Sequence, residues 1–377
     1  MRVLDLSLLF PGPYCGAILA ELGAEVIKVE RPGGGDWVRA VPPLDPETGE
    51  GLIFRTLNRG KKSLTLNLKA EEGRSILLRL AEGADVLLES FRPGVMERLG
   101  LGYDALARAN EGLIYCSLTG YGSAGPYRAR AGHDLNFIGL AGLLDLSGPA
   151  GGPPSIPGAQ MADVTGALWA AIGILGALLT REQTGVGQRV EASLLGSSLA
   201  CLRLDVTRLL AGEPVARGTG DLTGGRVSYN LYQTADGAYM SLAALEHEFW
   251  QAFCRAVGRM DLADQGMAPA VAGEPAYDAL CALFRTRTRQ EWVEALAGVE
   301  ACCEPVLALG EALASAPVQA LGMLTGDLPG SPVRLSPGVR GPGRLTAPSL
   351  GHHTAAILAE LGYDEGDVAR LRTAGIV

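Results

Sequence analysis

Two side chains in this sequence have the chemistry of proton transfer, and the first is His133. It lies in the stretch 131–137, after a glycine-rich loop that carries Gly120, Gly122 and Gly125. An imidazole titrates near neutral pH, so it can accept or donate a proton in catalysis. A lone histidine is also often a structural residue, and the residue type by itself leaves both interpretations open.

Asp163 is the second candidate, and it lies at the start of an apolar segment, residues 162–180, that is predicted to be a helix. A carboxylate in a first helical turn is a common N-terminal cap. The same residue can act as a base, because the helix dipole favours its ionised form whereas apolar surroundings raise its pKa.

The motifs of two other chemistries are missing. The first predicted strand–helix turn reads LFPGP at 9–13 instead of G-x-G-x-x-G, and its prolines lack the N–H donors that a pyrophosphate needs. We therefore do not expect NAD(P), although Glu30 ends the second predicted strand. The four histidines form no metal-binding spacing, so no metal is expected. His352 and His353 are expected at the surface.

The composition limits the possible partners. The chain has 377 residues, 47% of them hydrophobic, and a formal net charge of -9. Two folded domains are expected from this length, and nucleic acid is not the expected partner of so acidic a chain. All four lysines, Lys28, Lys61, Lys62 and Lys69, lie near the N-terminus. Either a genomic preference for arginine explains this, or these lysines face an anionic ligand.

Seven cysteines without a C-x-x-C pair indicate reduced thiols and a cytoplasmic protein. The start of the sequence carries no secretory pattern. The longest apolar stretch of helical character, residues 166–179, is shorter than the roughly 20 residues that a bilayer span needs. We therefore expect a buried core helix and no membrane partner.

The predicted elements must bring these residues together. Strands are expected at 3–6, 24–29, 85–89 and 113–118, alternating with helices at 11–22, 71–81 and 103–109. Such alternation predicts a parallel sheet covered by helices, with any ligand at the carboxyl ends of the strands. Farther along, Asp236-Gly237 predicts a hairpin between 229–234 and 238–242, followed by helices. The expected fold class is α/β, a large Rossmann-like domain plus a smaller α+β domain.

At this point the sequence resembles the family III CoA-transferase superfamily and, within it, the α-methylacyl-CoA racemases. The resemblance covers essentially the whole chain and is carried by several blocks in order: PGP at 11–13, GAEVIKVERP at 23–32, NRGKKSL at 58–64, FRPGV at 91–95, GHDLN at 132–136, ADV at 162–164 and SLGHHT at 349–354. Residues 42–51 and 225–230 depart from the racemases, which leaves the acyl chain open.

The resemblance implies a domain organisation. Residues 1–185 would form the large CoA-binding domain, 186–226 a linker helix and connection, 227–325 the small domain, and 326–377 a return segment whose helices rejoin the large domain. It also implies an interlocked homodimer, with each active site between the large domain of one chain and the small domain of the other.

The resemblance further implies the functional residues. His133 and Asp163 match the catalytic pair, and Glu246 matches an acid of the small domain that pairs with the histidine. Contacts with CoA or the acyl thioester are implied for Arg31, Asn67, Leu68, Lys69, Arg92, Gly132, Asp134, Leu135, Asn136 and Phe137.

Such a racemase would interconvert (2R)- and (2S)-2-methylacyl-CoA thioesters. One base removes the Cα proton from one face of a planar enolate, and the other returns a proton to the opposite face. Backbone N–H groups at the start of the 162–180 helix would hold the enolate oxygen. No cofactor is required, because the CoA thioester is the substrate. The alternative is a family III CoA-transferase with Asp163 as nucleophile, and His133 favours the racemase because acyl transfer needs no second base.

Overall fold

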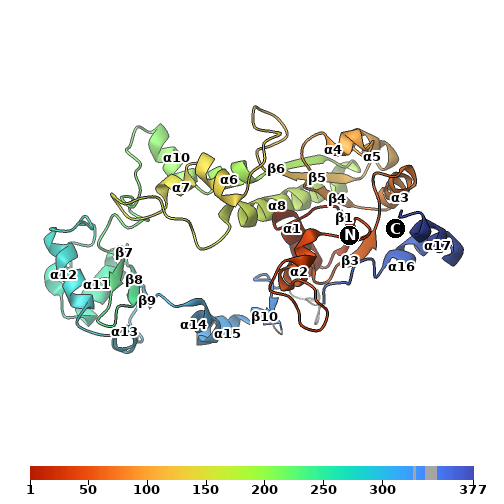
Figure 1. Ribbon diagram of the computed structural model, residues 1–377. Coiled ribbons are helices and arrows are strands. Elements are labelled where there is room, and N and C mark those ends of the chain that lie inside the picture. The colour runs from red at the N-terminus through yellow and green to blue at the C-terminus, as the bar shows by residue number, and fades with distance from the viewer. Residues whose placement is uncertain (326–327, 336–345) are drawn as a thin grey trace. The chain divides into compact units, whose positions relative to one another are not determined.

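The computed structural model describes residues 1–325, 328–335 and 346–377. These residues form two compact units. Unit 1 consists of Met1–Ala141, Ala159–Cys201 and Leu321–Val377, and unit 2 consists of Gly142–Gly158 and Leu202–Ala320. Figure 1 labels the elements of both units along the chain.

A six-stranded parallel sheet is the centre of unit 1. Its strands lie in the order β3-β2-β1-β4-β5-β6, which confirms the predicted α/β class with a smaller second sheet elsewhere. In this order the sheet grows in opposite directions on either side of the β1–β4 pair, and the loops after these two strands diverge to leave a crevice. The strands are β1 (Arg2–Asp5), β2 (Glu25–Glu30), β3 (Lys62–Thr65), β4 (Val86–Glu89), β5 (Ile114–Thr119) and β6 (Arg189–Ser193).

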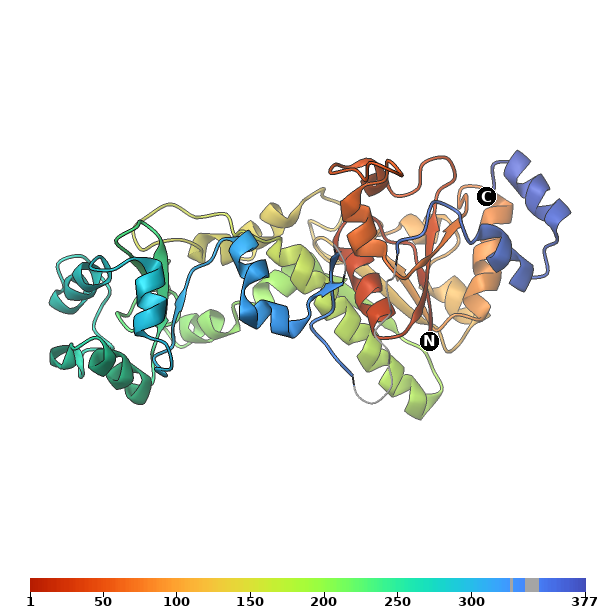
Figure 2. The same cartoon turned by 90° about the horizontal axis from the view of Figure 1, so that it is seen from below.

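Helices cover this sheet, and two of them, α1 and α8, pack side by side (Figure 2). The C-terminal helix α17 is tied to α3 by the Arg370–Glu72 ion pair. The helical elements of unit 1 are α1 (Pro11–Glu21), η1 (Trp37–Ala40), α2 (Leu52–Asn58), α3 (Glu71–Glu82), α4 (Val95–Arg98), α5 (Tyr103–Ala109), α6 (Asp134–Leu140), α8 (Met161–Thr184), α9 (Leu194–Ala200), α16 (Thr354–Glu360) and α17 (Glu365–Thr373).

The PGP block explains how α1 begins so close to the sheet. Pro11 occupies the first helical position, where a missing N–H costs no hydrogen bond. A Cβ at Gly12 would lie 2.2 Å from the Cβ of Ser7, so only glycine fits against the end of β1. The block therefore allows the start of α1 to pack closely against the chain that leaves β1.

Helix α8 differs from the buried core helix that was expected over residues 162–180. It runs over Met161–Thr184, and its length and composition alone would allow it to cross a bilayer, a test that core helices of other proteins also pass. One face, with Gly166 against Leu194, packs inside unit 1. The other face leaves large apolar side chains exposed, namely Leu168, Trp169, Ile172, Leu175 and Leu179. The expectation of a buried core helix was therefore wrong for this second face, whose large apolar side chains are exposed in the part of the chain that the structure describes.

Unit 2 is built around a small antiparallel sheet with the order β7-β8-β9. The predicted hairpin is present as β7 and β8, whereas β9 replaces what was expected to be helical. Stacked aromatic rings, including Tyr232, Phe253 and Phe284, fill its core. Its elements are α7 (Leu143–Leu146), α10 (Arg203–Leu210), β7 (Tyr229–Gln233), β8 (Tyr239–Ala243), α11 (His247–Ala256), η2 (Met260–Leu262), α12 (Pro275–Phe284), α13 (Arg289–Ala295), β9 (Cys303–Pro305), α14 (Leu309–Ala314) and α15 (Ala316–Leu321). A two-stranded piece, β10 (Leu324–Thr325) and β11 (Leu328–Pro329), lies in the part of the chain after Leu321 that belongs to unit 1.

The unit boundaries differ from the expected 1–185, 186–226, 227–325 and 326–377. The segment expected to be a linker contributes β6 to the parallel sheet, where it pairs with β5 from Arg189 to Ser193. Residues 142–158, expected in the large domain, belong to unit 2, and Leu321–Val377 belongs to unit 1. Contacts through space, which no local pattern reports, decide these assignments, and for β6 the contact is its pairing with β5.

Candidate active site

A cavity of about 830 Å³ lies at the carboxyl ends of the parallel strands. It is bordered by the loop after β1 (Leu8 to Pro11), the loop after β4 (Ser90 to Pro93) and the loop after β5 (Thr119 to Tyr121). β1 and β4 are the two strands between which the sheet reverses its growth, and α/β folds bind ligands at this place. We call this space the first cavity.

Asp163 and His133 both line the first cavity. Asp163 is half-buried in the first turn of α8. Burial raises the pKa of Asp163 to about 6, helped by the Asp134 carboxylate and opposed by the imidazole of His133. A carboxyl group with this pKa exchanges a proton near neutral pH, which suits a general acid or base.

Asp134, a predicted contact residue, holds the start of helix α8. Its Oδ1 accepts hydrogen bonds from the backbone N–H groups of Ala162, at 2.7 Å, and Asp163, at 3.1 Å. Asp134 therefore caps the start of α8 and does not line the first cavity. Two first-turn N–H groups expected to hold an enolate oxygen are thus already bonded, and that part of the prediction was wrong.

His133 is held at the cavity by the backbone around it. It is exposed and directly precedes α6, and its own N–H donates to Oδ1 of Asn136 at 3.0 Å. Gly132 allows this course of the chain, because a Cβ there would lie 2.6 Å from Oη of Tyr121 and 2.9 Å from the Phe137 ring. Of the predicted contact residues in this stretch, Gly132, Asn136 and Phe137 line the first cavity, whereas Leu135 does not.

The first cavity has a cationic side and an apolar side. Arg92, which was predicted, lines it together with Arg128 and Arg130, which were not. Trp37, Val41, Ile53 and Leu57 form much of the apolar side. These residues carry no motif. Only their position in or directly after η1, in α2, or in a loop beside the strand ends could have indicated them.

Other predicted contact residues lie away from the first cavity. Arg31 is exposed and its Nε donates to the carbonyl of Gly35. Asn67 follows β3, and its backbone N–H donates to the carbonyl of Ile376 at 2.8 Å. Leu68 packs against the core of unit 1, and Lys69 is exposed. Their contact with CoA remains a prediction.

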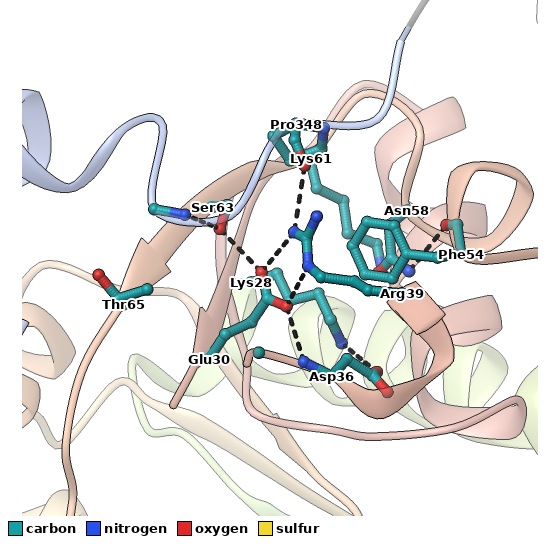
Figure 3. Close-up of polar contacts among 12 residues, drawn as sticks. Lys28, Glu30, Asp36, Arg39, Phe54, Asn58, Lys61, Ser63, Thr65 and Pro348 are labelled. Atoms are coloured by element: carbon teal, nitrogen blue, oxygen red, sulfur yellow. Dashed lines mark hydrogen bonds and ion pairs between the residues drawn. The ribbon is translucent and has the colours of Figure 1, made fainter. Parts of the chain in front are cut away.

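Lys28 and Lys61 of the N-terminal region are buried and bonded within the protein (Figure 3). Lys28 is buried against Asp36 at 3.1 Å, and Lys61 is buried against Asp5 at 2.7 Å. Burial lowers the pKa of Lys61 to about 8, although Asp5 opposes this effect. Lys62 forms an ion pair with Glu25. The interpretation that the lysines cluster for an anionic ligand is therefore wrong for Lys28, Lys61 and Lys62.

Glu246 and His353 are two further residues with predicted positions. Glu246, in unit 2, is exposed and directly precedes α11, so its pairing with the histidine stays a prediction. His353 was expected at the surface, but it is partly buried and its Nδ1 accepts the N–H of Ser63 at 3.2 Å. Within the described ranges no three His, Cys, Asp or Glu residues are grouped to hold a metal ion.

The fold and the first cavity define an α/β protein with a cavity at the carboxyl ends of its parallel strands, bordered by an acid and a histidine. The profile of CoA-transferase family III matches residues 1–354, and the chain belongs to this family of enzymes.

Its relatives carry two kinds of name. The mouse alpha-methylacyl-CoA racemase is 34% identical and aligns with 100% of this chain and 96% of its own length. The mouse succinyl-CoA:glutarate CoA-transferase is 33% identical, over 100% of this chain and 89% of its own. The succinyl-CoA:mesaconate CoA-transferase of Haloarcula marismortui is 34% identical, over 97% of this chain and 96% of its own. Similarity alone therefore does not separate the two reactions.

The fold is shared with solved structures of the same family. A CaiB/BaiF family protein from Brucella suis superposes with a TM-score of 0.79 at 32% identity, covering 96% of this chain and 98% of that one. A Mycobacterium tuberculosis protein superposes with a TM-score of 0.81 at 31% identity, covering 95% and 98%.

Proposed function

We propose that this enzyme racemises 2-methylacyl-CoA thioesters at Cα, within lipid metabolism. The observation that carries the proposal is that His133 and Asp163 line one cavity, close enough for the imidazole to influence the pKa of Asp163. One group takes the Cα proton while the C–H electron pair moves to the thioester oxygen, giving an enolate. The other group then donates a proton to Cα on the opposite face, and the carbonyl re-forms.

The raised pKa of Asp163 supports this assignment. With a pKa of about 6, the carboxyl group is present in both its protonated and its ionised form near neutral pH. It can therefore give a proton to Cα in one direction of the reaction and take one in the other. The reaction requires no cofactor, because the thioester itself makes the Cα proton acidic.

The proposal includes a homodimer in which Glu246 of one chain orients His133 of the other. The exposed apolar residues along α8, such as Trp169 and Ile172, support a second copy as their cover, because water-exposed apolar patches of this extent mark interaction surfaces. We also place the enzyme in the cytoplasm, away from nucleic acid and membranes, and its seven free cysteines support a reducing compartment.

The second candidate is a CoA-transferase, which the transferase names among equally similar relatives favour. In that reaction the ionised Asp163 attacks the thioester carbonyl and expels the CoA thiolate, which leaves a mixed anhydride. The CoA thiolate then attacks the aspartyl carbonyl, which releases the donor carboxylate and forms an aspartyl-CoA thioester. An acceptor carboxylate attacks this thioester and expels the CoA thiolate, and the thiolate attacks the acceptor carbonyl of the new anhydride, which forms the product thioester and frees the Asp163 carboxylate. This route uses Asp163 and gives His133 no necessary proton to move.

One experiment separates the two reactions. A single enantiomer of a 2-methylacyl-CoA is incubated with the enzyme in heavy water, with and without a free dicarboxylate. Racemisation with deuterium incorporated at Cα is the expected result. Transfer of CoA to the dicarboxylate without exchange would contradict it. His133→Ala should abolish the exchange, whereas His352→Ala, which changes an exposed histidine, should retain it.

A further inference from the structure

Strands β1, β2 and β3 have one apolar face and one polar face. The apolar side chains, such as Leu4, Ile27 and Leu64, belong to the hydrophobic core of unit 1. Because side chains alternate along a strand, the residues next to them point to the opposite face. The buried polar residues on that face, which we call the polar layer, are Asp5, Lys28, Glu30, Ser63 and Thr65. The proposed proton transfer does not use this layer.

Stability alone does not explain why the polar layer contains charged groups. Lys28 in β2 is fully buried, and so is Asp5 in β1. Moving a charge out of water is unfavourable, and apolar side chains of similar volume often fill such a space at no loss of stability. The groups that these charges hold in one arrangement are therefore a better explanation of the layer.

The ammonium group of Lys28 contacts two segments that lie far apart along the chain. Its Nζ donates a hydrogen bond to the carbonyl oxygen of Ser7, two residues after β1, at 2.9 Å. It also forms an ion pair with Oδ2 of Asp36 at 3.1 Å (Figure 3). Oδ1 of Asp36 accepts the N–H of Val38 at 3.2 Å, so that Asp36 caps the start of η1.

Both segments continue directly into walls of the first cavity. Residues 8–11, which follow Ser7, border the cavity on one side. Trp37 and Val38, which follow Asp36, border it on another. One buried ammonium group thus joins two walls of the same cavity.

The loop after β1 needs such support, because its backbone is strained. Leu9 lines the cavity with a φ of 69°, in the left-handed region that residues other than glycine rarely adopt. Strain of this kind persists only where the surrounding structure holds the backbone in place. Lys28 holds the loop at the carbonyl of Ser7, and Lys61 holds the next turn by donating to the carbonyl of Pro13 at 2.8 Å.

We propose that Lys28 is a positioning residue of the first cavity. Its ammonium group fixes the loop after β1 and the start of η1 relative to each other, and so sets the shape of the space that receives the substrate. The inference rests on the proposed function for its ligand, an acyl-CoA thioester. Because His133 and Asp163 lie on other segments, Lys28 should control thioester binding and not the proton-transfer step.

The test measures binding of 2-methylpropanoyl-CoA to the enzyme by calorimetry. Lys28→Met keeps the length of the side chain and removes its charge. It should weaken binding by about tenfold, which corresponds to roughly one lost hydrogen bond. In deuterium exchange at Cα, KM should rise in the same proportion while kcat stays at the wild-type value, a split that a loss of stability alone would not produce.

Arg181→Met is the matched control. Arg181, like Lys28, holds one carboxylate and one carbonyl, those of Asp85 at 2.7 Å and Gly112 at 3.1 Å. These partners precede β4 and β5, at the amino edge of the sheet, whereas the first cavity lies at the carboxyl edge. Arg181→Met should therefore bind the thioester as the wild type does, and equal binding by Lys28→Met would overturn the inference.

A second variant separates positioning from stability. Lys28→Met leaves the Asp36 carboxylate buried without its cation, so this variant should also unfold at lower urea concentration. Adding Asp36→Asn removes that charge, keeps an oxygen to cap η1 and should restore much of the stability. Binding should stay weak, because the Ser7 carbonyl has still lost the Lys28 donor.

Wild-type binding by the double variant would overturn the inference, because the ion pair would then serve stability alone. A wild-type enzyme that binds the thioester without deuterium exchange would instead contradict the proposed reaction. The comparison of binding among the variants would still decide the role of Lys28.

Discussion

The carboxyl edge of the parallel sheet has two halves that treat their polar groups in opposite ways. At the β2–β3 half, Glu30 accepts two hydrogen bonds from Arg39, and Ser63 and Thr65 bind the C-terminal segment 346–354 (Figure 3). At the β4–β5 half, Glu89 and Ser117 face a cavity. The same edge is thus closed by the protein's own chain on one side and open to ligands on the other.

The pKa values follow this division. Burial alone would raise the pKa of Glu30, but the Arg39 guanidinium outweighs it and holds the pKa below its ordinary value. Among the residues that the structure describes, no cation forms an ion pair with Glu89 or Asp163, and burial raises the pKa of both. A buried acid with a built-in cation is structural, whereas one without it is available for chemistry.

The largest expected effect comes from the open half. Asp163→Asn should lower the racemisation rate by about a thousandfold, within the range for loss of a general acid or base. Stability should be retained, because the raised pKa shows that the folded state disfavours the ionised carboxylate. Deuterium exchange at pH 7.5 measures the racemisation rate, and urea unfolding at the same pH measures the stability. Asp104→Asn, at the exposed start of α5, is the control. A large loss of stability in Asp163→Asn would contradict the prediction, because it would mean that Asp163 has a structural role like that of Glu30.

The closed half should respond in the opposite way. Arg39→Ala leaves the buried Glu30 without its cation and should destabilise the fold by about 3–5 kcal/mol. Since the pair lowers the pKa of Glu30, its stabilisation is present above the unfolded pKa and disappears as the pH falls through the folded value. Urea unfolding between pH 3 and 7 measures this. Arg31→Ala, an exposed arginine, should behave as wild type, and equal stability of the two variants would contradict the prediction.

A smaller effect on activity is expected from the loop that carries His133. Gly132→Ala places a methyl group against Tyr121 and Phe137, so the loop must shift. Misplacement of a catalytic group by about 1 Å lowers rates by about a hundredfold. Gly83→Ala, where a Cβ meets nothing within 4 Å, is the matched control. Steady-state kinetics of both variants measures the effect. Wild-type activity in Gly132→Ala would contradict the prediction, because it would mean that the loop accommodates the methyl group without displacing His133.

The smallest expected effect is a change in pH dependence. In the direction in which Asp163 is the base, kcat/KM should rise with pH through about 6, because only the ionised form accepts a proton. Asp134→Asn keeps an oxygen to cap α8 but removes the negative charge that raises the pKa of Asp163. The inflection should therefore move to lower pH. An unmoved or upward-shifted inflection in the measured pH profile would rule out this coupling.

Much of the fold could be predicted from the order of the residues. The runs that form β1, β2, β4 and β5 each contain at least two consecutive large apolar residues and are bounded by turn residues, so their places were found within a residue or two. β3 was missed because Lys62–Thr65 has a single large apolar residue, Leu64. β6 was taken for part of a linker because it is an exposed edge strand, held by its pairing with β5.

The candidate site was predictable only in part. His133 and Asp163 were named from sequence, and the structure brings both to the first cavity. The capping task of Asp134 was hidden, because its partners lie 28 and 29 positions farther along the chain. Ser117 carried no signal, since a serine inside a buried strand looks the same whether its hydroxyl has a partner or not.

The sequence by itself determined which segments form strands and helices, and through its ordered blocks it indicated the family. Only the tertiary structure decided which acids are neutralised and which remain free. Arg39 reaches the carbonyl of Pro348, 309 positions away, and Thr65 meets Thr354, 289 positions away. Burial and charge act through space, and the distance between two groups in space is fixed by the packing of the whole unit, not by their separation along the chain.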